Sequence, residues 1–341
     1  MNTIIYLSSI QLFPIQTGGA QVVHQYAKLL ASTNKVILIT VKAKQLSSKQ
    51  MLETTKNIIV LDILSANPIM KFLSPVTYFR IFQQILTQGP NKLVIEFPWF
   101  GTIGIISQYL LNIPFYIRCQ NIEYRRMQRL QRWYWPILMV FELFVYKCAT
   151  SIITISTQDK LDLHSELHIP LQKIHITEYT PDPKIFHPNK QSGAYIRKQL
   201  HLQNKYIVLF FGPLDYKPNI EAIEQIQTKI APKVTKLNPN IVFLIVGRNP
   251  NMHSSNNGVI FTGYVEKIQD YINASDLIIV PLISGGGIRT KILEAVSCDK
   301  TVITTPLGCE GIHLDFKQKR IMLSPINRFS NVITSHYKTQ L

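Results

Sequence analysis

The sequence predicts an α/β protein of two doubly wound, Rossmann-like domains that face each other across a cleft. Short, nearly continuous apolar runs alternate with segments of helical periodicity, which is typical of parallel strands covered by helices on both faces. The alternation lapses in a polar stretch with three prolines at residues 180–192 and then restarts. The 341 residues therefore divide into two domains of ordinary size.

The first half of the chain opens with an apolar run at 4–8 and a helical pattern at 20–31. Four further apolar runs predict buried strands at 36–41, 58–63, 93–96 and 114–118. We expect these elements to form an N-terminal domain over 1–180, followed by a linker at 181–192.

The second half repeats the alternation. Apolar runs predict strands at 206–211, 241–246, 277–281 and 301–304. Helices are expected at 266–274 and 288–297, and from a cap at Asn219 to about Ala231. These elements form a predicted C-terminal domain over 193–324, and the short segment 325–341 is the candidate to cross back to the first domain.

The composition is that of a globular chain, with 46% hydrophobic and 16% charged residues. The four cysteines contain no CxxC pair, which disfavours a zinc site or a disulfide framework and fits a reducing compartment. Met1–Ser9 has neither a basic region nor a small-residue cleavage site, so we expect no signal peptide and a cytoplasmic protein.

A net charge of +16, spread over both halves, suggests anionic partners such as nucleotide phosphates, an acidic membrane surface or nucleic acid. One stretch, 97–117, carries no charged residue and is long enough to span a bilayer. Polar residues and an Asn-Ile-Pro turn interrupt it, so a buried helix followed by a buried strand is the better interpretation.

The clearest chemical signal is a glycine-rich corner after the strand predicted at 277–281. Three glycines, Gly285, Gly286 and Gly287, precede a helix and would aim free N–H groups at an anion. Arg289 and Lys291 follow in the expected first turn, where cations oppose the helix dipole unless an anion is bound. Glu294 could accept hydrogen bonds from vicinal hydroxyls, as on a ribose. The alternative is an ordinary turn with solvated basic residues.

Five motifs of the second half together resemble the nucleotide-binding domain of the family 4 retaining glycosyltransferases, which have the GT-B fold. They are Phe210–Asn219, Val246–Pro250, Phe261–Val265 with Ala274–Asp276, Gly285–Ala295, and Pro306–Gly311. In the first half, Pro14–Ala20 resembles the family's glycine loop, and Asn121–Arg126 resembles its acceptor-side segment.

The resemblance implies sugar transfer from a nucleotide-diphosphate sugar to a glycan or lipid-linked acceptor, with retention and without an obligatory metal or other cofactor. Arg289, Lys291, Glu294 and Gln120 would be catalytic, and Asn121, Glu123 and Arg125 would lie on the acceptor side. Tyr264 is expected near the base or as a structural aromatic. The other donor-binding residues would be Gly18, Gly19, Gly212, Gly247, Arg248, Gly285, Gly286, Gly287 and Ile288.

The sequence departs from the family pattern in three places. Gly286 stands where the family often has a first Glu, as in a branch with the Gly-x-Arg-x-Lys pattern. Gln120 stands where a His near the anomeric centre is common, and it supplies an amide but no titratable group. The C-terminus is short. A protein that binds nucleotide or glycan without transfer, or a related GT-B epimerase, therefore remains an alternative.

A basic and aromatic cluster lies at 118–141. It contains five arginines (Arg118, Arg125, Arg126, Arg129, Arg132), then Trp133, Tyr134, Trp135 and an apolar run. Such a cluster suits peripheral contact with an anionic membrane, and the alternative is a core helix with a solvated basic face. No nucleic-acid motif accompanies it, so we expect no nucleic-acid partner. A Rossmann dehydrogenase is disfavoured because Gly-x-Gly-x-x-Gly does not follow the first strand.

Overall fold

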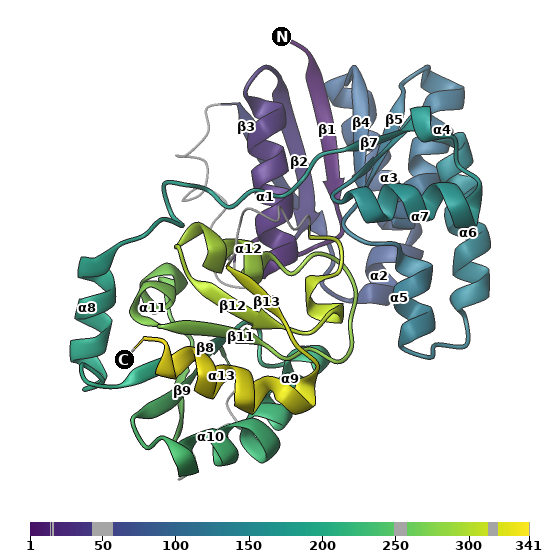
Figure 1. Cartoon of the computed structure of the whole chain (residues 1–341). Helices are drawn as coiled ribbons and strands as arrows, with labels where there is room; N and C mark the ends of the chain where they lie inside the picture. Colours follow the sequence, from purple (N-terminus) through teal and green to yellow (C-terminus); the bar gives the residue numbers. More distant parts are fainter. Residues whose placement is uncertain (14, 16, 43–56, 249–257, 313–319, 341) are drawn as a thin grey trace. The chain divides into compact units, whose positions relative to one another are not determined.

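The computed structural model describes residues 1–13, 15, 17–42, 57–248, 258–312 and 320–340. Contacts between residues divide the chain into two compact units, Met1–Tyr179 and Thr180–Leu341. Each unit is built around its own parallel sheet (Figure 1).

The sheet of the first unit has seven strands in the order β3-β2-β1-β4-β5-β6-β7. They are β1 (Thr3–Ser8), β2 (Lys35–Val41), β3 (Ile58–Leu64), β4 (Lys92–Glu96), β5 (Phe115–Cys119), β6 (Ser151–Thr154) and β7 (Ile174–Ile176). The helices are α1 (Gly18–Ala31), α2 (Pro68–Leu73), α3 (Pro75–Gln88), α4 (Gly101–Leu111), α5 (Glu123–Arg129), α6 (Trp135–Cys148) and α7 (Thr157–Leu167), with short 3₁₀ turns η2 (Pro98–Phe100) and η3 (Leu171–Lys173).

Side chains of β1 alternate between two cores, as the period of a strand requires. Ile4 and Tyr6 pack against α1 on one face, whereas Ile5 and Leu7 join the core formed with α3, α4 and α6 on the other. Helices therefore cover both faces of the sheet, which confirms the doubly wound arrangement.

The sheet of the second unit has six strands in the order β10-β9-β8-β11-β12-β13. They are β8 (Tyr206–Phe211), β9 (Ile241–Val246), β10 (Val259–Gly263), β11 (Leu277–Val280), β12 (Thr301–Thr304) and β13 (Ile321–Leu323). The helices are α8 (Lys190–Gln199), α9 (Lys217–Gln225), α10 (Ala231–Leu237), α11 (Ile268–Ala274), α12 (Thr290–Ser297) and α13 (Phe329–Lys338), with a π-helical η4 (Ile226–Ile230) and 3₁₀ turns η5 (Leu307–Cys309) and η6 (Ile326–Arg328).

Two expectations at the ends of the second unit need correction. Helix α8 begins at Lys190, inside the expected linker, because the Asn189 side chain accepts a hydrogen bond from the Ser192 N–H and caps the helix. Helix α13 packs on its own unit, where we expected a segment that crosses back. Its Phe329 and Ile333 are fully buried in the core around β8.

The uncharged stretch 97–117 forms a helix and then a strand, as expected. Asn112 ends α4 in the left-handed conformation, with φ of 54°. The helix is not buried on all sides, however, since Tyr109 and Leu110 are more than 70% exposed. Among the helices that the structure describes, none combines the length and apolarity that a bilayer span requires.

Candidate functional site

The glycine-rich corner joins β11 to α12 at the carboxyl end of the second sheet, the edge where open α/β sheets bind ligands. Gly285 and Gly287 have φ of 102° and 79°, a region that favours glycine. Arg289 is the N-cap of α12 and lies just before the first turn, where we expected it inside that turn. Its Nη1 donates to the carbonyl oxygens of Gly286, at 2.6 Å, and Gly287. The guanidinium therefore holds the corner's backbone and keeps its charge beside the helix N-terminus.

Lys291 lies in the first turn of α12, half-buried at the end of β8. Its Nζ is 4.3 Å from the centroid of the Phe210 ring and donates to Oδ1 of Asn219 at 2.9 Å. Burial lowers the pKa of Lys291 to about 7, and the charge of Arg289 adds to that effect while Glu294 opposes it. An anion placed against Nζ would favour the charged form of this lysine.

Asn219 does not cap a helix, contrary to expectation. Helix α9 begins two residues earlier, with Tyr216 as its N-cap and Pro218 in its first turn. Asn219 is 4% exposed, and its Nδ2 donates to the Pro213 carbonyl at 2.7 Å while its Oδ1 accepts from Lys291. The amide therefore ties Lys291 to the loop after β8, a role that its position near a helix start did not signal.

Replacing Asn219 with alanine is expected to weaken nucleoside diphosphate binding about fivefold to tenfold, because Lys291 loses a hydrogen bond worth about 1 kcal/mol that orients it. Isothermal titration calorimetry with the bound diphosphate would measure the change. Asn219→Asp is the informative companion, since it keeps the contact to Lys291 but adds a negative charge that repels phosphate. An Asn219→Ala protein that binds as tightly as the wild type would contradict this role.

Glycines directly follow the neighbouring strands β8 and β9, close to Lys291. A Cβ atom on Gly212 would lie 2.9 Å from the Lys291 Nζ, and one on Gly247 would lie 2.0 Å from the carbonyl oxygen of Gly212. Side chains are therefore excluded at both positions, and the backbone stays open at this edge.

The remaining predicted residues of the second unit lie near the same edge. Arg248 and Tyr264 are exposed and directly follow β9 and β10. Ile288 is half-buried within the corner, and Glu294 is 3% exposed in α12. Asn249 and Pro250, which belong to the second motif, lie outside the described residues.

In the first unit, Gly18 and Gly19 form the first turn of α1, which begins two residues before the expected start. The Gly19 carbonyl accepts a hydrogen bond from Nε2 of Gln120 at 3.2 Å, so the structure brings these two predicted site residues together. A Cβ atom on Gly19 would lie 3.3 Å from the Gln120 Oε1. Pro14 and Gln16 of the same motif lie outside the described residues.

Gln120 belongs to a buried polar group that we call the Glu96 cluster: Tyr6, Glu96, Arg118 and Gln120. The Glu96 carboxylate, fully buried, accepts from Arg118 Nη1 at 2.9 Å, from Gln120 Nε2 at 2.7 Å and from the Tyr6 hydroxyl. Burial opposes the charge of Arg118, yet attraction to Glu96 leaves the pKa of Arg118 above its ordinary value. Arg118 is therefore an internal residue, which corrects its assignment to a surface basic cluster.

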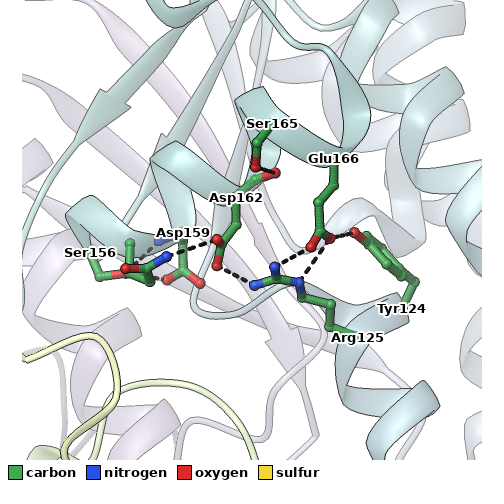
Figure 2. A network of polar contacts seen from close by, with 8 residues as sticks. Tyr124, Arg125, Ser156, Asp159, Asp162, Ser165 and Glu166 are labelled. Atoms are coloured by element: carbon green, nitrogen blue, oxygen red, sulfur yellow. Dashed lines mark hydrogen bonds and ion pairs between the residues drawn. The ribbon is translucent and has the colours of Figure 1, made fainter.

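The predicted acceptor-side residues have separate partners. Figure 2 shows Arg125 of α5 reaching across to Asp162 and Glu166 of α7, with Tyr124 donating to Glu166. Glu123 instead pairs with Arg126 at 2.6 Å within α5. Arg125 and Arg126 thus neutralise carboxylates of their own unit, and the surface basic cluster that we expected loses these members as well.

Comparison with known proteins gives a match in the second unit. Residues 205–328 match the family model described as "Glycosyl transferases group 1". The UDP-Gal:α-D-GlcNAc-diphosphoundecaprenol α-1,3-galactosyltransferase of Escherichia coli is 23% identical over 252 residues, 68% of this chain and 62% of that protein. The aligned parts cover between 31% and 62% of the curated relatives.

Solved structures match over nearly the whole chain. A sucrose-phosphate synthase of Thermosynechococcus elongatus gives a TM-score of 0.76 at 17% identity, covering 99% of this chain and 89% of that one. The HepE protein of Anabaena, crystallised with UDP and glucose, gives 0.74 at 14% identity, covering 100% and 91%. At these identities the likeness shows the fold, which is GT-B.

Proposed function

We propose that this protein is a retaining glycosyltransferase of family 4, in the branch with the Gly-x-Arg-x-Lys pattern. It would move a sugar from a nucleotide-diphosphate sugar to a glycan or lipid-linked acceptor in surface polysaccharide or glycolipid assembly. The observation that carries the proposal is the corner at 285–291, where glycines with positive φ and two cations meet at the carboxyl edge of a sheet matched by a glycosyltransferase model.

In the proposed reaction, the bond between the anomeric carbon and the diphosphate breaks while an acceptor hydroxyl oxygen bonds to the same face of the sugar. The proton of that hydroxyl passes to the leaving diphosphate. Negative charge grows on the leaving diphosphate, and stabilising such charge is usually the largest catalytic contribution. Lys291, Arg289 and the corner's backbone N–H groups would supply it, and Glu294 would hold the ribose. We expect no obligatory metal, so EDTA should leave the rate unchanged.

The chemistry of the Gln120 side chain raises the question of whether the protein transfers sugar or only binds it. Its Nε2 already donates to Glu96 and to Gly19, so the side chain is fixed in place but offers no titratable proton. This favours, as a second candidate, a GT-B protein that binds nucleotide or glycan without turnover. Release of nucleoside diphosphate from the donor separates the two functions.

The relatives suggest the substrates and the location. UDP is bound by the Anabaena protein, and the E. coli relative acts on a diphosphoundecaprenol-linked sugar. We therefore propose a UDP-sugar donor, a membrane-linked or surface glycan acceptor, and work at the inner face of the plasma membrane.

A thermal shift assay with UDP, GDP and ADP tests the binding step. One diphosphate at about 100 times its dissociation constant should add about 2.7 kcal/mol of stability and raise the melting temperature. Transfer is then followed as diphosphate release from the matching nucleotide sugar with acceptor extracts. Glu294→Ala should fold normally and lose release. If no nucleotide shifts the melting temperature, both candidate functions are wrong.

A further inference from the structure

The helices that cover one face of the first sheet expose apolar side chains on their outer side. Ile81 of α3, Ile103 of α4 and Val145 of α6 belong to one buried core, so these three helices lie on the same face of the sheet. A helix whose outer side met only water would be polar on that side. Each of these helices instead exposes two or more large apolar side chains there.

The exposed apolar residues recur at helical spacing, so each helix turns a stripe outward. Helix α2 adds three more and contributes no buried residue at all. We call the whole set the apolar face: Ile69, Met70 and Leu73 of α2; Val76, Phe79 and Leu86 of α3; Ile106, Tyr109 and Leu110 of α4; Ile137, Val140 and Phe144 of α6. Leu73, Tyr109 and Leu110 are each more than 70% exposed.

The four helices are neighbours. The Phe100 ring, just before α4, lies 5.4 Å from Phe72 of α2 and 6.0 Å from Tyr78 of α3. Gly101 approaches α6 so closely that an added Cβ atom would lie 2.4 Å from the Val145 side chain. The stripes therefore lie on adjoining helices, and twelve large apolar side chains exposed there exceed the scattered exposure that is usual for soluble monomers.

The exposed charged residues on these four helices, and just before α6, are all basic. Residues 63–95 and 97–122 contain no Asp or Glu, and within 130–150 the only acid is Glu142, which is fully buried. The exposed charged residues here are Arg80, Arg132 and Lys147. Trp133, 81% exposed, precedes α6 and is of the type that lies at bilayer interfaces.

We propose that the apolar face docks on an anionic lipid bilayer, with α2, α3, α4 and α6 lying in the interface. Basic residues around an apolar surface complement anionic headgroups, whereas two copies of this face would bring like charges together. The surface shares Arg132, Trp133 and the start of α6 with the cluster at 118–141, but it excludes the paired Arg118, Arg125 and Arg126. It adds α2, α3 and α4 with Arg80, and Lys147 at the end of α6. The inference supplies the membrane contact of the proposed function but requires neither nucleotide binding nor transfer.

Co-sedimentation of the intact protein with vesicles tests the proposal. Wild type should bind phosphatidylcholine vesicles containing phosphatidylglycerol, and bind pure phosphatidylcholine vesicles at least about tenfold more weakly. The triple variant Leu73→Gln, Leu110→Gln, Val140→Gln should lose at least about tenfold in partitioning, since each side chain gives up apolar burial. Leu237→Gln, 73% exposed in the second unit, is the matched control and should bind like the wild type.

Three outcomes would overturn the proposal. Wild type could fail to sediment with either vesicle, or the triple variant could bind as well as the wild type. Alternatively, size-exclusion chromatography with light scattering could show a dimer that the triple variant converts to a monomer, making a second copy the occupant. The thermal shift of the triple variant with diphosphate reports separately on its folding and on its nucleotide site. If neither the wild type nor the variant shows a shift, the proposed function is wrong, but the membrane proposal is unaffected.

Discussion

Replacing Lys291 with alanine is expected to lower sugar transfer by at least about 100-fold, the range seen when one charge-stabilising donor is removed. The ammonium of this residue lies between the Phe210 ring and Asn219, at the end of β8. No other described lysine has its pKa lowered so far, to about 7, and burial is the main cause. Keeping the charged form of this lysine is therefore costly in the free protein, and a bound anion would offset that cost.

The same pKa predicts how nucleotide affinity depends on pH. Well below pH 7 the lysine of the free protein is already charged, so it adds no pH dependence to the affinity. Above pH 7 it is neutral, and a diphosphate that raises its pKa must bind together with a proton. Affinity should therefore fall by up to about tenfold per pH unit above 7. Calorimetric titrations in buffers of different ionisation enthalpy would measure the proton uptake.

Lys291→Met is the control that separates charge from packing. The pKa of Lys291 is about 7 in the folded protein, below the ordinary 10.5 of an unfolded lysine. Between pH 7 and 10.5 this lysine is therefore mostly neutral in the folded protein and mostly protonated in the unfolded chain. Wild-type stability relative to Lys291→Met should thus rise with pH from 7 to 10.5, and at pH 6 the variant should be the more stable by about 1–3 kcal/mol. Transfer activity that survives in either variant, or a pH-independent affinity, would contradict the role of Lys291.

Apolar patterning explains why so much of the fold was predictable. The strands at 206–211, 241–246 and 301–304 match the structure to the residue, because buried parallel strands are continuous apolar runs. Strands β6, β7, β10 and β13 went unpredicted. They are short, and β7 and β13 expose two of their three residues, so they carry a weak hydrophobic signal.

The site was predictable only as far as local sequence determines it. Glycines and cations close together in the chain marked the corner, but Asn219 reaches Lys291 over 72 positions. Likewise, Arg118 was one arginine of five in the sequence, and its partner Glu96 was simply the end of a strand. Register makes them partners, since Glu96 and Arg118 are paired residues of β4 and β5. A charge pattern in the sequence contains no information about that register.

Glu96→Ala should destabilise the first unit by about 3–5 kcal/mol, because it leaves Arg118 buried without its carboxylate. Arg118 is only 2% exposed and also stacks on the Tyr26 ring at 4.3 Å, so it has no route to solvent. Chemical denaturation of both proteins would measure the loss. The control is Arg320→Ala, which breaks a pair with both partners more than 40% exposed and should change stability by less than about 1 kcal/mol.

A double variant, Glu96→Ala with Arg118→Ala, distinguishes an ion pair from ordinary packing. If the pair matters, the second change costs much less than it does alone, since no unpaired charge remains. Additive losses would show that Glu96 stabilises the unit without its partner.

Glu96→Gln retains the side-chain volume but weakens the hydrogen bond that holds Gln120 at 2.7 Å. A folded Glu96→Gln enzyme with lower kcat and unchanged diphosphate affinity would place Gln120 in the transfer step, whereas unchanged kcat would leave the cluster a purely structural role.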